Sequence, residues 1–148
     1  MEIRQIGKGE RGESLVQSLL DVWESSVRAT HDFLREGDVE YLRPFVEQGL
    51  REVPLLFCAE ENETPAGFLV MAEDSIEMLF VHADFRGRGI GSALMREALA
   101  RDARRVDVNE QNPQALGFYQ RFGFEAVSRD ELDSLGLPYP ILHCELKA

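Results

Sequence analysis

A glycine-rich segment between an apolar run and an amphipathic run is the feature that most constrains this chain. The segment reads Arg86-Gly87-Arg88-Gly89-Ile90-Gly91. Residues 78–81 before it are strongly apolar and indicate a strand over 76–82, and residues 87–101 place their apolar side chains on one face of a helix. The chain is therefore expected to pass from a buried strand through a glycine-rich turn directly into a helix, as in α/β folds.

The same segment has the properties of an anion-binding loop. Glycines at 87, 89 and 91 remove side chains where backbone must approach a ligand closely. The first amides of a helix have no partner within it and carry the positive end of its dipole. Arg86 and Arg88 add positive charge to an otherwise acidic chain. The placement between a buried strand and an amphipathic helix favours a phosphate-binding site over a simple turn, and the missing Lys-Ser/Thr pair argues against an ATP or GTP loop.

A second glycine pattern lies near the N-terminus and is interpreted differently. Gly7, Gly9 and Gly12 have the spacing of a dinucleotide fingerprint, and Asp32 lies at about the right distance downstream. Residues 2–6, however, alternate polar and apolar, whereas the first strand of a doubly wound sheet is continuously apolar. We therefore expect a flexible turn here and no dinucleotide site.

Hydrophobic periodicity predicts the remaining elements. Two helices are expected first, one capped by Ser14 and ending near residues 30–33 and one over 38–50. A later helix over 113–121 has Pro near its first position. The expected strands are 2–6, 55–60, 65–72, 76–82, 105–109, 124–128 and 141–146. Two helices, an antiparallel meander and a βαβαβ tail predict an α/β (mixed α+β) fold, with a mixed sheet flanked by helices on both faces.

Composition limits the partners and the compartment. A length of 148 residues suits a single domain over 1–148, and the apolar runs are too short to cross a bilayer. The net charge of −11 disfavours nucleic acid and is compatible with a basic acceptor. Without a signal pattern at the N-terminus, we expect a cytoplasmic protein whose two cysteines, Cys58 and Cys144, are buried free thiols.

Two motifs resemble those of one family. The segment 86–91 matches the Gln/Arg-x-x-Gly-x-Gly/Ala signature of the GNAT superfamily of N-acetyltransferases. Residues 112–124 match its downstream motif, Asn112-x-x-Ala115-x-x-x-Tyr119-x-x-x-Gly123-Phe124. Segments 29–33 and 137–140 are similar to those of small bacterial, YjaB-type members.

The resemblance implies a site for acetyl-CoA. It implies parallel strands at 76–82 and 105–109 that splay apart and hold pantetheine in the gap. The pyrophosphate would lie on amides of the glycine-rich segment, Asn112 would bind the pantetheine arm, and Tyr119 would lie near the thioester sulfur. The expected cofactor-binding residues are Leu79, Phe80, Val81, Arg86, Gly87, Arg88, Gly89, Ile90, Gly91, Ser92, Asn112 and Tyr119.

Direct acetyl transfer to an amine requires a base, a polarised carbonyl and a stabilised thiolate. The backbone amide of Val81 is a candidate to polarise the carbonyl, and Tyr119 is the candidate donor to the thiolate. The candidate bases are Asp107 and Glu77, with Glu110 as a further alternative. No protein nucleophile is required.

The acceptor half of the site is expected at His31, Asp32 and Tyr139, although a histidine beside an aspartate is also typical of a helix cap. The spacing of histidines and cysteines gives no metal site. A protein lysine, an N-terminal amine and a small-molecule amine all remain open as acceptors, and a homodimer is also open. The alternative function is a non-catalytic acyl-CoA-binding or sensing module of the same fold.

Overall fold

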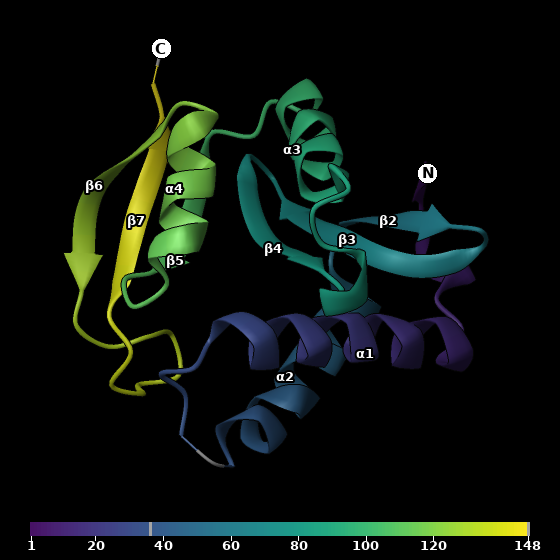
Figure 1. Cartoon of the computed structure of the whole chain (residues 1–148), viewed down its shortest axis with the longest axis horizontal. Coiled ribbons are helices and arrows are strands. Elements are labelled where there is room, and N and C mark those ends of the chain that lie inside the picture. The colour runs from purple at the N-terminus through teal and green to yellow at the C-terminus, as the bar shows by residue number, and fades with distance from the viewer. Residues whose placement is uncertain (36, 148) are drawn as a thin grey trace.

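A computed structural model describes residues 1–35 and 37–147. Within these residues seven strands form one sheet, and helices cover both of its faces (Figure 1). The elements in chain order are β1 (Glu2–Gln5), η1 (Lys8–Glu10), α1 (Glu13–Thr30), α2 (Asp38–Glu52), β2 (Leu55–Glu61), β3 (Thr64–Ala72), β4 (Ser75–Val81), η2 (Ala83–Phe85), α3 (Ile90–Ala100), β5 (Arg105–Asn109), α4 (Pro113–Arg121), β6 (Phe124–Asp130) and β7 (Ile141–Leu146). The predicted mixed sheet with helices on both faces is confirmed.

The strand order is β1-β2-β3-β4-β5-β7-β6. Strands β1 to β4 are each antiparallel to the next. Short turns join β2 to β3 and β3 to β4, whereas η1, α1 and α2 lie between β1 and β2. Strand β5 follows the crossover helix α3 and pairs with β4 in parallel. The last strand, β7, inserts between β5 and β6 and is antiparallel to both.

Two hydrophobic layers enclose the meander. Leu56, Cys58, Phe68 and Val70 pack against α1 and α2 on one face of the sheet. Phe57, Ala59, Leu69 and Met71 pack on the other face, with α3 and α4. Side chains alternate between faces along a strand, and both faces here are covered, so residues 55–59 of β2 and 65–72 of β3 are all apolar. Figure 1 shows α1 and α2 on one side of this part of the sheet and α3 on the other.

Strands β4 and β5 separate soon after they begin. They are paired only at Ser75 with Arg105 and at Ile76 with Val106. A bulge at Glu77 interrupts the register between β3 and β4, since Met78 still pairs with Val70 but Ile76 pairs with Met71. The predicted splay of the two strands is confirmed.

Several predicted boundaries are wrong, among them the end of α2, which lies at Glu52 rather than at residue 50. Helix α1 begins at Glu13 with Gly12 as its N-cap, so Ser14 lies inside the helix and caps nothing. Helix α3 begins at Ile90 rather than at residue 87, because Gly87 and Gly89 have left-handed φ values of 77° and 80° that no helix contains. Strand β6 continues two residues past the expected end at 128.

The N-terminal glycine pattern is a turn, as predicted. Strand β1 is an edge strand, antiparallel to β2. Gly7 and Gly12 are N-caps of η1 and α1 with ordinary extended backbone. A dinucleotide fold would instead begin with a central parallel strand.

The predicted buried thiols are confirmed, because Cys58 and Cys144 are both free and buried. Burial raises the pKa of Cys58 to about 12, so this thiol is unreactive at neutral pH. Over the described residues, every helix is too short or too polar to cross a membrane.

Candidate active site

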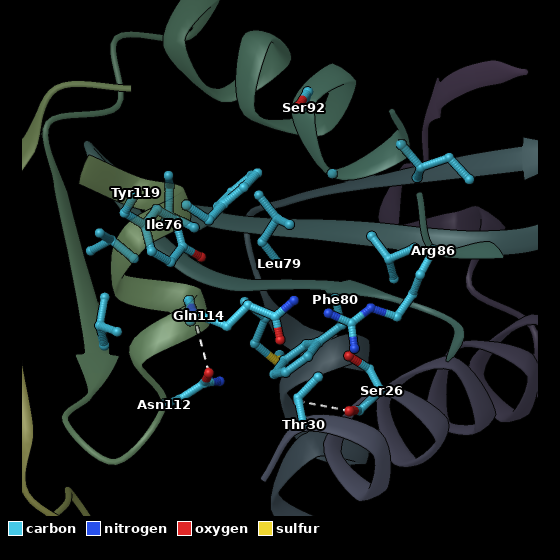
Figure 2. A pocket seen from close by; sticks show the side chains of 18 of the residues that line it. Ser26, Thr30, Ile76, Leu79, Phe80, Arg86, Ser92, Asn112, Gln114 and Tyr119 are labelled. Atoms are coloured by element: carbon cyan, nitrogen blue, oxygen red, sulfur yellow. Dashed lines mark hydrogen bonds between the residues drawn. The ribbon is translucent and has the colours of Figure 1, made fainter. Parts of the chain in front are cut away.

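A cavity of about 420 Å³ opens where β4 and β5 separate. Its walls come from five parts of the chain: the end of α1, the strands β4 and β5, the loop and first turn at 85–92, and α4. Figure 2 shows Leu79 and Phe80 in its middle, with Tyr119 on one side, Arg86 on the other and Ser26 and Thr30 below. The glycine-rich segment and the downstream motif, about 25 residues apart, therefore share one cavity.

The edge of β4 that faces this cavity is free to pair with a ligand. His82 N–H donates to Ala66 O on β3 at 2.8 Å. Because backbone groups alternate in direction along a strand, the N–H groups of Leu79 and Val81 point away from β3 and into the gap. Pairing of β4 with β5 ends at Ile76. The strand thus offers amide-pairing groups of the kind that an extended peptide-like arm can use.

The glycine-rich loop places backbone amides that have no hydrogen-bond partner within α3 at one end of the cavity. Gly89 is the N-cap of α3, and the first helical bond runs from Ala93 N–H to Gly89 O at 3.0 Å. The amides of Ile90, Gly91 and Ser92 therefore have no partner within the helix and carry the positive end of its dipole. This geometry suits a phosphate or pyrophosphate group.

Two arginines add charge to this end. The Arg88 guanidinium lies 5.2 Å from the centre of the Phe85 ring, which holds it beside the loop. The Arg86 side chain points into the cavity toward Phe80 and Ser26 (Figure 2). Both residues, with Gly87, Gly89, Gly91 and Ser92, were expected from the sequence; all of these except Arg88 line the cavity.

Asn112 has a structural function as well as a place in the cavity wall. Its Oδ1 accepts a hydrogen bond from the Ala115 N–H at 3.1 Å and so caps α4, whose first residue is Pro113. Asn112 is only 7% exposed. Capping uses one oxygen, and the amide nitrogen remains available as a donor to a ligand.

Tyr119 belongs both to the core and to the site. It is 8% exposed and packs edge-on against Phe118 and Phe124. Its hydroxyl points into the cavity (Figure 2). Burial raises the pKa of the phenol well above its ordinary value, so the Tyr119 hydroxyl stays protonated near neutral pH and can donate a hydrogen bond.

The three candidate bases occupy different environments. Glu77 and Asp107 both line the cavity, from β4 and β5. Desolvation, and then the charge of Asp107, raise the pKa of Glu77, which makes its carboxylate more basic. Glu110 pairs with Arg129 at 2.6 Å, and that contact lowers the pKa of Glu110. The geometry therefore favours Glu77 and Asp107 over Glu110.

The predicted acceptor residues lie near one another around the end of α1: the Phe33 ring is 5.2 Å from the His31 ring and 5.8 Å from the Tyr139 ring. His31 ends α1 and lines the cavity, with its Nδ1 at 2.7 Å from Thr30 Oγ1, and burial lowers its pKa. Asp32 lines a neighbouring hollow, which His31 also borders. The Tyr139 hydroxyl donates to the Asp38 carboxylate and ties the 131–140 loop to the start of α2.

Some residues that line the cavity were not predicted from the sequence. The structure adds Ser26, Thr30, Met78, Phe85, Gln114 and Phe118. Ser26 and Thr30 are four residues apart on α1, and Thr30 Oγ1 donates to Ser26 O at 2.8 Å. The sequence signal that could have identified Ser26 and Thr30 is their spacing of four residues, which places two polar side chains on one face near the end of an amphipathic helix.

Comparison with known families matches residues 53–126 to the description "Acetyltransferase (GNAT) domain". The chain is 40% identical over 135 residues to the peptidyl-lysine N-acetyltransferase YjaB of Salmonella typhimurium, with 90% of each chain covered. It is 41% identical to the protein of the same name from Escherichia coli, covering 90% of this chain and 89% of that one.

Comparison with solved structures agrees with this match. The solution structure of apo-form YjaB from Escherichia coli superposes with a TM-score of 0.84 at 37% identity, covering 97% of this chain and 95% of that one. The PaiA N-acetyltransferase from Thermoplasma acidophilum, solved in complex with coenzyme A, shares the fold at a TM-score of 0.68 and 16% identity over the full length of both chains. Over residues 1–35 and 37–147, no cluster of three His, Cys, Asp or Glu side chains could hold a metal ion.

Proposed function

The chain belongs to the GNAT family of acetyltransferases, and we propose that the amine it acetylates is the side chain of a protein lysine. It is an acetyl-CoA-dependent N-acetyltransferase that passes the acetyl group to a primary amine. The observation that carries the lysine assignment is the 40% identity, over 90% of both chains, to a relative named peptidyl-lysine N-acetyltransferase. A cavity bordered by Glu77 and Asp107 also suits a cationic acceptor. We treat residues 1–148 as one domain, because a single sheet joins both ends of the described chain.

In this proposal acetyl-CoA lies across the cavity from the α3 end to Tyr119. The pyrophosphate rests on the amides of Ile90, Gly91 and Ser92, with Arg86 and Arg88 beside it. The pantetheine arm pairs with the free edge of β4 at Leu79 and Val81 and takes a further hydrogen bond from Asn112. The remaining predicted cofactor residues, Phe80, Gly87, Gly89 and Tyr119, line the same space.

Glu77 is the proposed base. A lysine with a pKa of about 10.4 must lose its proton before it attacks, which at pH 7 requires about 4.6 kcal/mol. A carboxylate of raised pKa that lines the cavity can take that proton, directly or through water. The amine then attacks the thioester carbonyl directly, and the Val81 N–H, pointing into the gap, stabilises the developing oxyanion.

Tyr119 is the proposed donor to the departing thiolate. A thiol has a pKa near 8.5 and a phenol near 10, so full proton transfer is already uphill by about 2 kcal/mol. Burial raises the pKa of Tyr119 further. We therefore assign its hydroxyl a hydrogen bond to the thiolate sulfur, with the thiolate taking a proton only on release.

A panel of three acceptors tests the lysine assignment. The first is a peptide with a blocked N-terminus and one lysine, the second has arginine in place of lysine and a free N-terminus, and the third is a linear polyamine. Acetyl-CoA consumption should require the lysine peptide, and mass spectrometry should place the acetyl group on its side chain. Faster consumption with the second or third acceptor would overturn the assignment.

A further inference from the structure

A histidine that the mechanism above does not use lies between two carboxylates. His143 Nδ1 is 2.7 Å from Asp107 Oδ1, and His143 Nε2 is 2.7 Å from Asp130 Oδ2. An ionised carboxylate only accepts hydrogen bonds, so both contacts are hydrogen bonds only when both ring nitrogens carry protons. The arrangement therefore favours the imidazolium, and the hydrogen bonds to Asp130 and then Asp107 raise the pKa of His143.

The strand register places the three side chains together. His143 on β7 is directly opposite Asp107 on β5. On its other side His143 is opposite Ser128 of β6, and Asp130 lies two residues along, on the same face. Cys144 and Leu142 point to the opposite face, toward the α3 and α4 layer. The triad thus occupies the face of β5, β7 and β6 that α4 does not cover.

Of the three side chains His143, Asp107 and Asp130, it is Asp107 that connects the triad to the proposed reaction site. Asp107 lines the cavity beside Glu77, and its negative charge is one of the two causes of the raised pKa of Glu77. His143 itself does not line the cavity. Its influence on the acceptor amine must therefore pass through the position and charge of the Asp107 carboxylate.

We propose that His143 is a positioning residue for amine acetylation, which as an imidazolium fixes the Asp107 carboxylate beside Glu77 and offsets its negative charge. This proposal rests on the proposed role of Glu77 as the base. When His143 is protonated, Asp107 repels a charged Glu77 less, and Glu77 releases its proton at lower pH. When His143 is neutral or absent, the uncompensated charge of Asp107 raises the pKa of Glu77 and moves the acidic limb of the rate profile to higher pH.

The other charged groups on this face are accounted for. By strand alternation they are Arg105 of β5, Glu145 of β7 and Glu125 of β6. Arg105 pairs with Asp74 at 2.7 Å, and Glu125 pairs with Lys147 at 2.8 Å. Glu145 is directly opposite Arg105, and its charge contributes to the raised pKa of Arg105. Within residues 1–35 and 37–147, the side chains hydrogen-bonded to the His143 ring are those of Asp107 and Asp130.

Two substitutions separate position from charge. In His143→Asn the amide nitrogen takes the place of Nδ1 and keeps a donor to Asp107, whereas in His143→Gln it takes the place of Nε2 and keeps only the donor to Asp130. Both variants lose the positive charge. We expect kcat/KM for a lysine peptide to fall about tenfold in His143→Gln and less in His143→Asn, with the acidic limb shifted to higher pH in both and KM for acetyl-CoA unchanged.

The decisive comparison repeats His143→Gln in the Asp107→Asn background. There the substitution should change neither kcat/KM nor the acidic limb, because its target carboxylate is gone. An equal loss in both backgrounds would overturn the proposal, since a strand-clamping role alone would act without Asp107.

A titration of the His143 ring by NMR gives a readout that needs no turnover. Its midpoint should lie above about 6.5 in the wild type and fall in both Asp107→Asn and Asp130→Asn. An ordinary midpoint in the wild type would also overturn the proposal. Failure of the proposed function would look different, because wild-type protein would then leave the lysine peptide unacetylated or Glu77→Gln would retain full activity.

Discussion

Ile76 and Val106 are the last residues at which β4 and β5 remain paired, and the cavity begins where that pair ends. The bulge at Glu77 immediately follows Ile76, so the same position that ends the pairing also carries the proposed base. In the proposed complex, strand separation exposes backbone groups for the pantetheine arm, and the bulge places a carboxylate beside the thioester end. Cofactor binding and amine deprotonation thus share one structural origin.

Gly89 should be essential for acetyl-CoA binding because of its backbone, not its size. Its φ is +80°, and nothing within 4 Å would meet an added Cβ. Gly89→Ala costs about 1–2 kcal/mol in that conformation and should distort the amides that hold the pyrophosphate. We expect the dissociation constant for coenzyme A, measured by calorimetry, to rise at least about tenfold.

Gly12→Ala is the matched control for that variant. Gly12 is also a helix N-cap and also has open space around its Cβ position, but its φ is −70°. Coenzyme A binding should be unchanged. If Gly12→Ala weakened binding and Gly89→Ala did not, the assignment of the phosphate site would be wrong.

Tyr119→Phe should separate binding from turnover. The phenyl ring keeps the packing against Phe118 and Phe124 and loses only the hydroxyl that points into the cavity. The dissociation constant for coenzyme A should stay the same, while kcat should fall at least about tenfold, the effect expected of a lost hydrogen bond to the leaving thiolate. Tyr41→Phe, at an exposed site on α2, should keep the wild-type rate. Wild-type turnover in Tyr119→Phe would exclude the proposed role.

Glu77→Gln should make the protein more stable and less active. The folded-state pKa of Glu77 is raised, so the folded protein holds this proton more tightly than the unfolded chain does. Stability is therefore lost as pH rises through that range, and the charged form is unfavourable at pH 7. Replacement by a neutral amide should raise Tm at pH 7, with a smaller gain at pH 4, and lower kcat with a lysine peptide.

The control for that variant is Glu2→Gln, on the exposed edge strand β1. Neither Tm nor kcat should change. A Glu77→Gln protein with a lower Tm at pH 7 would show that the carboxylate stabilises the fold, and unchanged kcat would assign the base to Asp107 or to water.

Arg11 should be important for stability through a buried cap. Its guanidinium donates to Leu50 O, Val53 O and Ile6 O, which joins the end of α2 to the end of β1. Removing a buried charged donor leaves these carbonyls without the guanidinium as a partner. Arg11→Met should therefore lower the free energy of unfolding, measured by urea denaturation, by about 2–3 kcal/mol. Arg4→Met removes only exposed ion pairs and should cost less than about 1 kcal/mol. Equal losses in the two variants would contradict this account.

The sequence was most informative where local chemistry decides structure. The glycine-rich loop, the Pro113 helix start and the apolar runs of β2 and β3 follow from backbone geometry and burial, and each lies close to its predicted place. Boundaries failed where a glycine could either cap or continue a helix, as at Gly12 and Gly89.

Contacts between residues that are far apart in the chain could not be predicted from the sequence in the same way. The pairing of His143 with both Asp107 and Asp130 depends on the insertion of β7 between two earlier strands, and no local pattern encodes that order. Asp32 and Tyr139 were assigned to the acceptor side from segment likeness. In the structure Asp32 lines a hollow that shares His31 with the cavity, and the Tyr139 hydroxyl donates to Asp38. Their role in acceptor binding stays a prediction.

The central claim is that this cavity carries out acetyl transfer and does not merely bind acetyl-CoA. The most direct test measures thioester consumption and acetyl-lysine formation together, with wild-type protein and a blocked lysine peptide. The account predicts that the two rise in equal amounts, and that both fall at least about tenfold in Tyr119→Phe. Tight coenzyme A binding with no thioester loss for any amine would contradict it and would indicate a binding module of the same fold.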